Sequence, residues 1–275
     1  MCDETEFRQG RSWLGSVEPD IDQGVFQVYF ILSDQSAAGG PAVWAEINQD
    51  CYFNEYNIEG VCQEQNEIYL EFVPDKMAKA LTTLKTSNPR SVKMKLIRKS
   101  EVPCLSFEVE MGQALRDRNC VHDFPVIVLP RRMWGDYKEP AMPQFDISIF
   151  LPEVKSLRHL MERYKSLGQS VTLTANKEGR LTIKVESDDG VFSTHFPHLK
   201  VPVYRDETLP WPRPDSQLLP DSASVRVDLK RLNIFLAGDQ LQPKKVIANI
   251  VEREMLHIFS LYDDLMIQYF LPVCI

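Results

Sequence analysis

Hydrophobic and polar residues alternate along most of the chain, in short runs that Gly, Pro, Asn, Asp and Ser separate. Alternation with a period of two, in runs rich in β-branched and aromatic residues, is typical of strands. In the first half these runs occupy residues 25–32, 43–47, 67–72, 91–97, 104–110 and 121–128. In the second half they occupy residues 146–151, 170–175, 180–186, 191–196, 225–227, 245–251, 255–260 and 265–271. The pattern predicts a sheet-rich protein.

Three stretches follow the 3.6-residue period of an amphipathic helix instead. The first, residues 74–86, starts with a proline and places apolar residues on one side and lysines on the other. The second covers residues 152–167 and ends before a glycine. The third, residues 228–238, has Asp228 in the position of an N-cap. We therefore expect helices that are entered directly from strands.

The order of these elements divides the chain, because the second half repeats the sequence of strands and helices found in the first. Residues 129–145 contain prolines and a glycine that interrupt any regular element, which predicts an interdomain connector. Residues 25–128 and 146–275 are then the two domains. Residues 1–24 show no sustained periodicity, and we expect them to be a divergent, largely disordered N-terminus.

Composition narrows the class of protein. The formal net charge of −8 would argue against binding nucleic acid if the charges were spread evenly. The six cysteines form neither a Cys-x-x-Cys pair nor a compact cluster with histidines, so we predict no metal and no cofactor. No apolar run approaches the ~20 residues that cross a bilayer, and the start carries no signal-peptide pattern. We expect an intracellular, soluble protein.

The charges are not spread evenly. Residues 74–100 hold eight Lys and Arg residues against the single acidic residue Asp75, and the other two predicted helices are also locally basic. One interpretation is that these are ordinary solvated helix faces, because Lys and Arg are good helix formers. The other is that the helices line one concave surface and attract phosphates, since salt screens the remaining negative charge beyond ~8 Å.

Long segments of the sequence resemble the Hus-type subunit of the heterotrimeric DNA-damage checkpoint clamp, the nine-one-one clamp, which is related to proliferating cell nuclear antigen. The matching segments are FNEYNIEGVCQEQNEIYLEF at 53–72, HDFPVIVLPRRMW at 122–134, SIFLPEVKSLRHLMERYKSL at 148–167, THFPHL at 194–199, RVDLKRLNIFLAGDQLQPKKVIANIV at 226–251 and DDLMIQYFLP at 263–272. The resemblance implies an α+β fold, the sliding-clamp or DNA-clamp fold. In it, two similar domains carry outer antiparallel sheets and inner helices.

The resemblance also implies a function. Such a chain is a non-catalytic subunit of a ring that encircles DNA at damage sites, supports checkpoint signalling and recruits repair factors. Its implied partners are two other checkpoint-clamp subunits, double-stranded DNA bound without sequence preference, a clamp loader and DNA repair enzymes, with no membrane. The implied location is the nucleus, with a cytoplasmic pool.

Candidate site residues follow from placing the predicted elements on the family's ring. The residues expected to face DNA are Lys76, Lys79, Lys155, Arg158 and Lys230. The residues expected at strand-to-strand subunit interfaces are Val121, Val126, Val128, Phe192 and Thr194. A surface for partner peptides is expected at Met133, Trp134 and Tyr137, although Trp134 could equally pack into the domain core.

Two histidine patterns have spacings that catalytic or metal sites can use. His122 and Asp123 are adjacent, but neighbours on a strand point to opposite faces, so no catalytic residue is predicted. His195 and His198 have a spacing that some metal sites use, yet no further His or Cys lies near them in sequence, which favours solvated histidines in a turn.

The N-terminus departs from the resemblance. Family members open with a strand and an inner helix, and residues 1–24 show neither clearly. An uncovered sheet would expose apolar surface and unpaired backbone groups. The alternative function is therefore an interaction scaffold, or an isoform, that keeps the clamp fold but cannot assemble into a ring.

Overall fold

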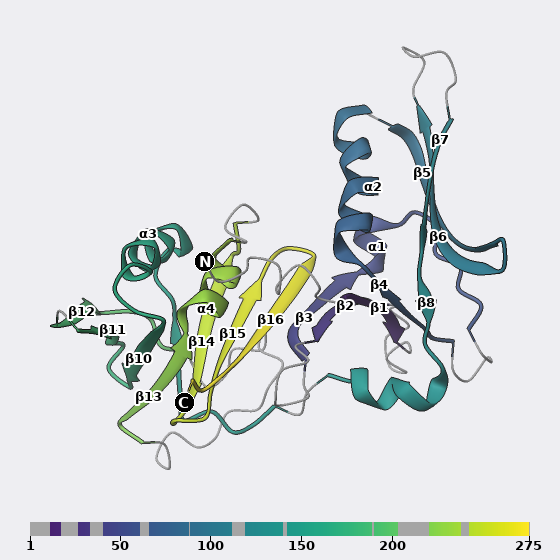
Figure 1. The fold of residues 1–275 in the computed structure, drawn as a ribbon. Helices are drawn as coiled ribbons and strands as arrows, with labels where there is room; N and C mark the ends of the chain where they lie inside the picture. The colour runs from purple at the N-terminus through teal and green to yellow at the C-terminus, as the bar shows by residue number, and fades with distance from the viewer. Residues whose placement is uncertain are drawn as a thin grey trace. The chain divides into compact units, whose positions relative to one another are not determined.

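The structure, a computed structural model, divides the chain into two compact units (Figure 1). Unit 1 comprises Met1–Pro41 and Glu46–Glu139, and unit 2 comprises Ala42–Ala45 and Pro140–Ile275. The structure describes the residues at 12–17, 27–33, 41–60, 66–87, 89–111, 119–139, 142–188, 190–202, 220–237 and 242–274.

Unit 1 consists of two antiparallel sheets and one long helix. Its strands are β1 (Ser12–Val17), β2 (Gln27–Ser33), β3 (Pro41–Asn48), β4 (Ile68–Phe72), β5 (Pro89–Lys99), β6 (Val102–Met111), β7 (Asn119–Pro125) and β8 (Ile127–Val128). Its helices are α1 (Gln49–Tyr52), α2 (Pro74–Ser87) and the 3-10 helix η3 (Arg131–Tyr137). The strand orders are β8-β4-β1-β2-β3 and β5-β6-β7, so β5 and β7 are the two edges of the second sheet.

Unit 2 has the same kinds of layers. Its strands are β9 (Ile147–Phe150), β10 (Ser170–Asn176), β11 (Leu181–Ser187), β12 (Gly190–Phe196), β13 (Ser222–Asp228), β14 (Lys245–Val251), β15 (Met255–Leu261) and β16 (Leu265–Pro272). Its helices are α3 (Val154–Tyr164) and α4 (Leu229–Leu236). The strand orders are β16-β15-β14-β9 and β12-β11-β10-β13, with antiparallel neighbours.

The two units repeat one topology. The order β3-β2-β1-β4 in unit 1 corresponds to β12-β11-β10-β13 in unit 2, and β5-β6-β7 corresponds to β14-β15-β16. In each unit one helix, α2 or α4, follows directly after the fourth strand of the first sheet. The two similar domains and the α+β class expected from the sequence are thus confirmed. Unit 2 begins with a further pair, β9 and α3, for which the described part of unit 1 shows no counterpart.

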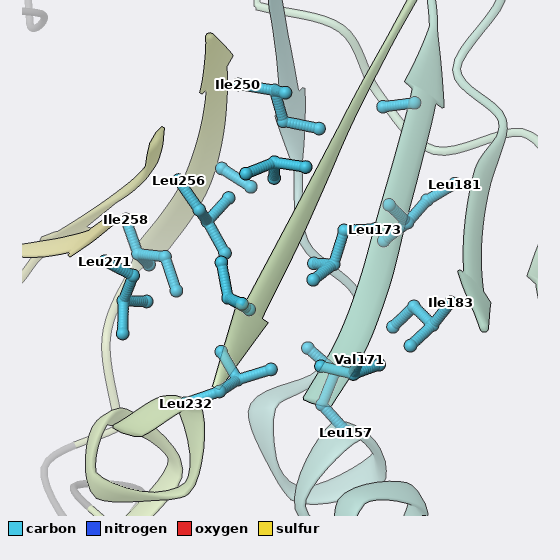
Figure 2. Packing of buried hydrophobic residues seen from close by; sticks show 14 of the residues in the cluster. Leu157, Val171, Leu173, Leu181, Ile183, Leu232, Ile250, Leu256, Ile258 and Leu271 are labelled. Atoms are coloured by element: carbon cyan, nitrogen blue, oxygen red, sulfur yellow. The ribbon is translucent and has the colours of Figure 1, made fainter. Parts of the chain in front are cut away.

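The core of unit 2 lies between its sheets and helices (Figure 2). Leu157 and Leu232 enter it from α3 and α4, and Figure 2 shows the side chain of Leu157 beside that of Val171. Burial of one such aliphatic side chain stabilises the fold by roughly 1.5–3 kcal/mol. At the start of α4, Oδ1 of Asp228 accepts a hydrogen bond from the backbone N–H of Arg231 at 2.9 Å, which confirms the predicted cap.

The described core of unit 1 is centred on aromatic rings. The ring of Phe124 lies 6.2 Å from that of Phe72 and 6.0 Å from that of Phe107. Helix α2 covers this cluster with Ala80, which is buried, and with Met77, which is partly buried. The apolar side predicted for this helix therefore faces the core.

Strand β1 differs from the prediction, because it lies inside the N-terminal segment that was expected to lack regular structure. The run SWLGSV is short and contains a glycine, so its local pattern is weak. Its conformation comes from two antiparallel ladders instead, one with β2 and one with β4. The rest of the predicted disordered segment, residues 1–11 and 18–24, lies outside the described residues.

Candidate nucleic-acid interface and subunit edges

Helix α3 buries one side and leaves Lys155 on the other. Leu157, Met161 and Tyr164 are buried, at the spacing of one helix face. Lys155 is exposed, as expected for a phosphate-binding residue. Arg158 lies on the flank between the two sides and is only half-exposed, so it is less accessible than Lys155.

The hydroxyl of Tyr164 joins α3 to the strands beneath it. Its oxygen lies 2.7 Å from Oγ1 of Thr194 on β12, and 3.5 Å from the carbonyl oxygen of Ile183 on β11. These contacts hold the C-terminal end of α3 against β11 and β12.

Helix α4 contacts α3 within unit 2. Leu229, Leu232 and Phe235 are buried in the core, whereas Lys230 is exposed. Because both helices bury their apolar sides in the same core, their exposed lysines lie on the outward side of this helix pair. Unit 2 therefore carries two of the lysines predicted to face DNA, together with Arg158, on two neighbouring helices.

Helix α2 of unit 1 carries the other two lysines. Lys76 and Lys79 are exposed. Among the described residues, no ion pair holds Lys76, Lys79, Lys155 or Lys230. Such lysines remain available to phosphates.

The basic residues of β5 are different, although they belong to the same basic run in the sequence. Lys95 Nζ lies 2.7 Å from a carboxylate oxygen of Glu108, and Lys99 Nζ lies 2.8 Å from one of Asp123. The hydrogen bond to Asp123 raises the pKa of Lys99, and the same bond holds the pKa of Asp123 below its usual range. Within the run at 74–100, Lys76 and Lys79 of the helix thus have no described ion pair, whereas Lys95 and Lys99 of the strand are paired.

Two strand edges correspond to the predicted subunit interfaces. Strand β7 is an edge of the β5-β6-β7 sheet, and β12 is an edge of the β12-β11-β10-β13 sheet. Val121 on β7 is 55% exposed and Phe192 on β12 is 40% exposed, which is high for apolar side chains. Both residues thus lie at open ladder edges of the described chain.

Three of the expected interface residues need correction or qualification. Val126 is 4% exposed, and its N–H donates to the carbonyl oxygen of Pro103 at 3.0 Å. It is therefore a core residue that separates β7 from β8. Val128 is exposed, but it pairs with Leu70 in the β8–β4 ladder. Thr194 lies on β12, yet its hydroxyl already contacts Tyr164 within the unit. The continuous strand expected at 121–128 is wrong because Val126 turns into the core.

The connector contains η3, which holds the predicted peptide surface. The ring of Trp134 stacks on Tyr69 at 4.8 Å between centroids, and its Nε1–H donates to the carbonyl oxygen of Leu129 at 3.1 Å. Met133, Trp134 and Tyr137 are each half-buried. Burial, together with Glu67, raises the pKa of Tyr69. Trp134 is thus fixed against unit 1 while part of its surface stays accessible.

Comparison with known proteins assigns the family. Residues 26–275 match the family described as Hus1-like protein. The chain is 38% identical to the human Checkpoint protein HUS1 over 244 residues, which cover 88% of this chain and 85% of that protein.

The chain belongs to the Hus1-like family.

A further relative and one solved structure are also similar to this chain. The Drosophila melanogaster Checkpoint protein Hus1-like is 27% identical over 91% of this chain and 87% of its own length. The structure of the Proliferating Cellular Nuclear Antigen from Entamoeba histolytica matches with a TM-score of 0.64 at 12% identity, over 97% of this chain and 90% of that one. At this identity the structural match shows the fold alone. The Hus1-like chain therefore has the sliding-clamp fold that its sequence predicts.

One buried polar group of this Hus1-like chain escaped the sequence reasoning. His257 on β15 is fully buried, with its Nε2 3.0 Å from Oε1 of Gln268 and its Nδ1 2.9 Å from Nδ2 of Asn249. Burial lowers its pKa to about 4, so the ring is neutral. The sequence shows only a lone histidine in an apolar strand. Its hydrogen-bonding partners lie on two other strands, so the local pattern does not reveal them.

His122, His195 and His198 lie in surroundings that are ordinary for surface strands and turns. His122 Nε2 is 3.6 Å from the sulfur of Cys120, and His195 Nδ1 is 3.0 Å from Oγ1 of Thr182. His198 is exposed. Over the described residues, no group of His, Cys, Asp and Glu could hold a metal ion. Nor does any described helix of this Hus1-like chain have the length and apolar character to cross a membrane.

Proposed function

We propose that this Hus1-like chain is a non-catalytic subunit of a ring-shaped checkpoint clamp that holds DNA. The observation that carries the proposal is the uncompensated lysine charge on α2, α3 and α4, in a fold whose helices each bury the opposite side. Two further findings support the proposal. Relatives in the family are named checkpoint proteins, and the fold is that of a replicative clamp.

The proposed contact with DNA is electrostatic. Lys76, Lys79, Lys155 and Lys230, with Arg158 at the flank, meet phosphates rather than base edges, so binding is independent of sequence. The overall charge of −8 does not oppose this, because salt screens charges that lie more than ~8 Å away. No residue of the chain has a catalytic role in this function.

The proposed partners are two other clamp subunits, which add strands at the edges of β7 and β12. Strand addition satisfies the open backbone groups of an edge, and Val121 and Phe192 supply apolar contacts there. A clamp loader, DNA repair enzymes and a place in the nucleus, with a cytoplasmic pool, follow from the same proposal. Met133, Trp134 and Tyr137 are proposed as a surface for partner peptides, because adaptable side chains there remain partly exposed.

The test is co-expression with two candidate clamp subunits, followed by size-exclusion chromatography with light scattering. We expect one complex with each chain present once, and no closed ring of this chain alone. Val121→Asp should release one partner and Phe192→Asp the other, while each variant keeps its fold. A monomeric chain that binds neither partner would favour the alternative, a clamp-fold scaffold outside any ring.

A further inference from the structure

The exposed side of α3 carries a histidine between two permanent positive charges. Lys155, His159 and Arg163 follow one another at every fourth residue of the helix, and all three are exposed. Residues four apart are neighbours on a helix surface, with about 5–6 Å between their Cβ atoms. Leu157 and Tyr164 point into the core on the other side. His159 therefore shares the exposed side of α3 with the lysine that is proposed to meet phosphate.

The ring of His159 is not engaged by the rest of the described chain. Among the described residues it makes no hydrogen bond and no ion pair. By contrast, Nδ1 of His195 lies 3.0 Å from Oγ1 of Thr182, and both ring nitrogens of His257 have partners in the core. Once it is protonated, an unengaged imidazole can donate an N–H to a phosphate oxygen.

The charges around this histidine are mostly positive. Helix α4 packs against α3. The charged residues of the two helices and of the α4 cap are Lys155, Arg158, Glu162, Arg163, Asp228, Lys230 and Arg231. Beneath α3, the core-facing residues of β10 and β11 are apolar, and β12 adds the hydroxyl of Thr194. The helix pair as a whole therefore attracts an anion.

A phosphate on this surface changes the balance between the two forms of a histidine. Histidine side chains gain their positive charge between pH 8 and pH 5. Neighbouring cations disfavour the charged form, and an adjacent anion favours it. A phosphate held by Lys155 and Arg163 supplies that anion beside His159. Phosphate binding and protonation are then linked, so the affinity for DNA depends on pH.

We propose that His159 contacts a DNA phosphate in its protonated form, so that the chain takes up a proton when it binds DNA. His159 can make this contact only if the exposed side of α3 faces DNA, so the inference rests on the proposed function. The lysines keep a constant charge near neutral pH, whereas the contribution of His159 grows as the pH falls. The ring then holds DNA more tightly at pH 6 than at pH 8.

The test measures the affinity of the assembled ring for a short linear duplex by fluorescence anisotropy, at pH 8 and pH 6 and at several salt concentrations. The duplex has hydroxyl ends, because terminal phosphates titrate in the same pH range. The difference between wild-type and His159→Gln rings isolates this residue, since histidines of the partner subunits are present in both. At pH 6 the wild type should gain about fivefold in affinity over His159→Gln. Its salt slope should also be steeper by up to roughly 0.9, because one more phosphate contact releases counterions.

Two further variants make the comparison specific. His159→Lys carries a fixed charge and should bind at pH 8 about as tightly as the wild type does at pH 6. His195→Gln is the matched control, because His195 is also exposed but pairs with Thr182 on β11. Thr182 alternates with the buried Ile183, so His195 projects away from the core and from α3. This control should keep the pH dependence of the wild type.

The variants also separate this inference from the proposed function. Equal pH dependence in the wild type and in His159→Gln, with weaker binding by Lys155→Ala at both pH values, would overturn the inference and leave the proposed function intact. Equal loss of pH dependence in His195→Gln would overturn it as well, because the effect would then not be specific to α3. If neither Lys155→Ala nor His159→Gln changed the affinity, α3 would not face DNA, and both would fail. Circular dichroism at each pH verifies that every variant is folded.

Discussion

The hydroxyl oxygen of Tyr164 and Oγ1 of Thr194 lie 2.7 Å apart and connect α3 with the edge strand β12. One side chain belongs to the helix proposed to face DNA, and the other to the strand proposed to meet a neighbouring subunit. The contact links the helix that carries Lys155 to this edge strand.

Removal of that hydroxyl should weaken unit 2. We expect Tyr164→Phe to lower the free energy of unfolding by about 1 kcal/mol, because one buried hydrogen bond is lost while the ring still packs. Urea denaturation measures the change. Thr194→Val and the double variant complete a cycle, in which the two losses should not add. Strict additivity would show that the hydroxyls do not interact.

His257 should make stability depend on pH. Its pKa is about 4 in the folded chain and near 6.5 when unfolded, so the unfolded state binds the proton more readily. The stability that depends on the neutral ring is fully present above pH 6.5 and is lost as the pH falls toward 4, by roughly 3 kcal/mol. Urea midpoints between pH 7.5 and 4.5 should fall less steeply for His257→Gln. An unchanged slope would contradict the assignment.

The turn between β10 and β11 requires glycine at position 179. Gly179 has φ +81°, and a Cβ there would clash with the carbonyl oxygen of Leu199. We expect Gly179→Ala to cost on the order of 1–3 kcal/mol, from backbone strain and displacement of the neighbouring chain. Gly135→Ala is the control, because no atom lies within 4 Å of its Cβ position. Thermal unfolding should separate the two variants.

Local sequence periodicity predicted those helices and strands in which buried residues recur at the period of the element. The apolar stripe of α3 and the alternation of β11 are readable in sequence, because Leu157 and Met161, or Ile183 and Val185, recur at the period of their element. The resemblance to the clamp family then supplied the fold. Strand β1 was missed because partner strands determine its conformation, not its own residues.

The site was predicted less completely than the fold. Exposure of Lys76 and Lys155 follows from helix periodicity, but the pairing of Lys95 and Lys99 does not, because Glu108 and Asp123 reach them across neighbouring strands. Val126 continues an apolar run, and only the structure shows that it turns into the core. Contacts between strands far apart in sequence carry no local signal.

The division of the basic run gives a matched test of DNA binding. Lys76 and Lys79 on α2 have uncompensated charge, whereas Lys95 and Lys99 on β5 are held by carboxylates. All four are exposed. In the assembled ring, Lys76→Ala/Lys79→Ala should weaken binding to short linear duplex, and Lys95→Ala/Lys99→Ala should leave it nearly unchanged.

Salt dependence identifies the cause of that loss. Each phosphate contact releases counterions, so the slope of log affinity against log salt should fall by roughly 0.9 for each lysine removed from α2. The loss should be equal for duplexes of unrelated sequence, because phosphates carry no base identity. Linear duplex is needed, since a closed ring also retains circular DNA by topology.

A wild-type slope in the α2 variant, or a loss confined to some sequences, would show that α2 does not face the phosphates. An equal loss in the β5 variant would instead show that DNA binding depends on the overall charge of unit 1. Paired and unpaired lysines would then contribute equally to the affinity.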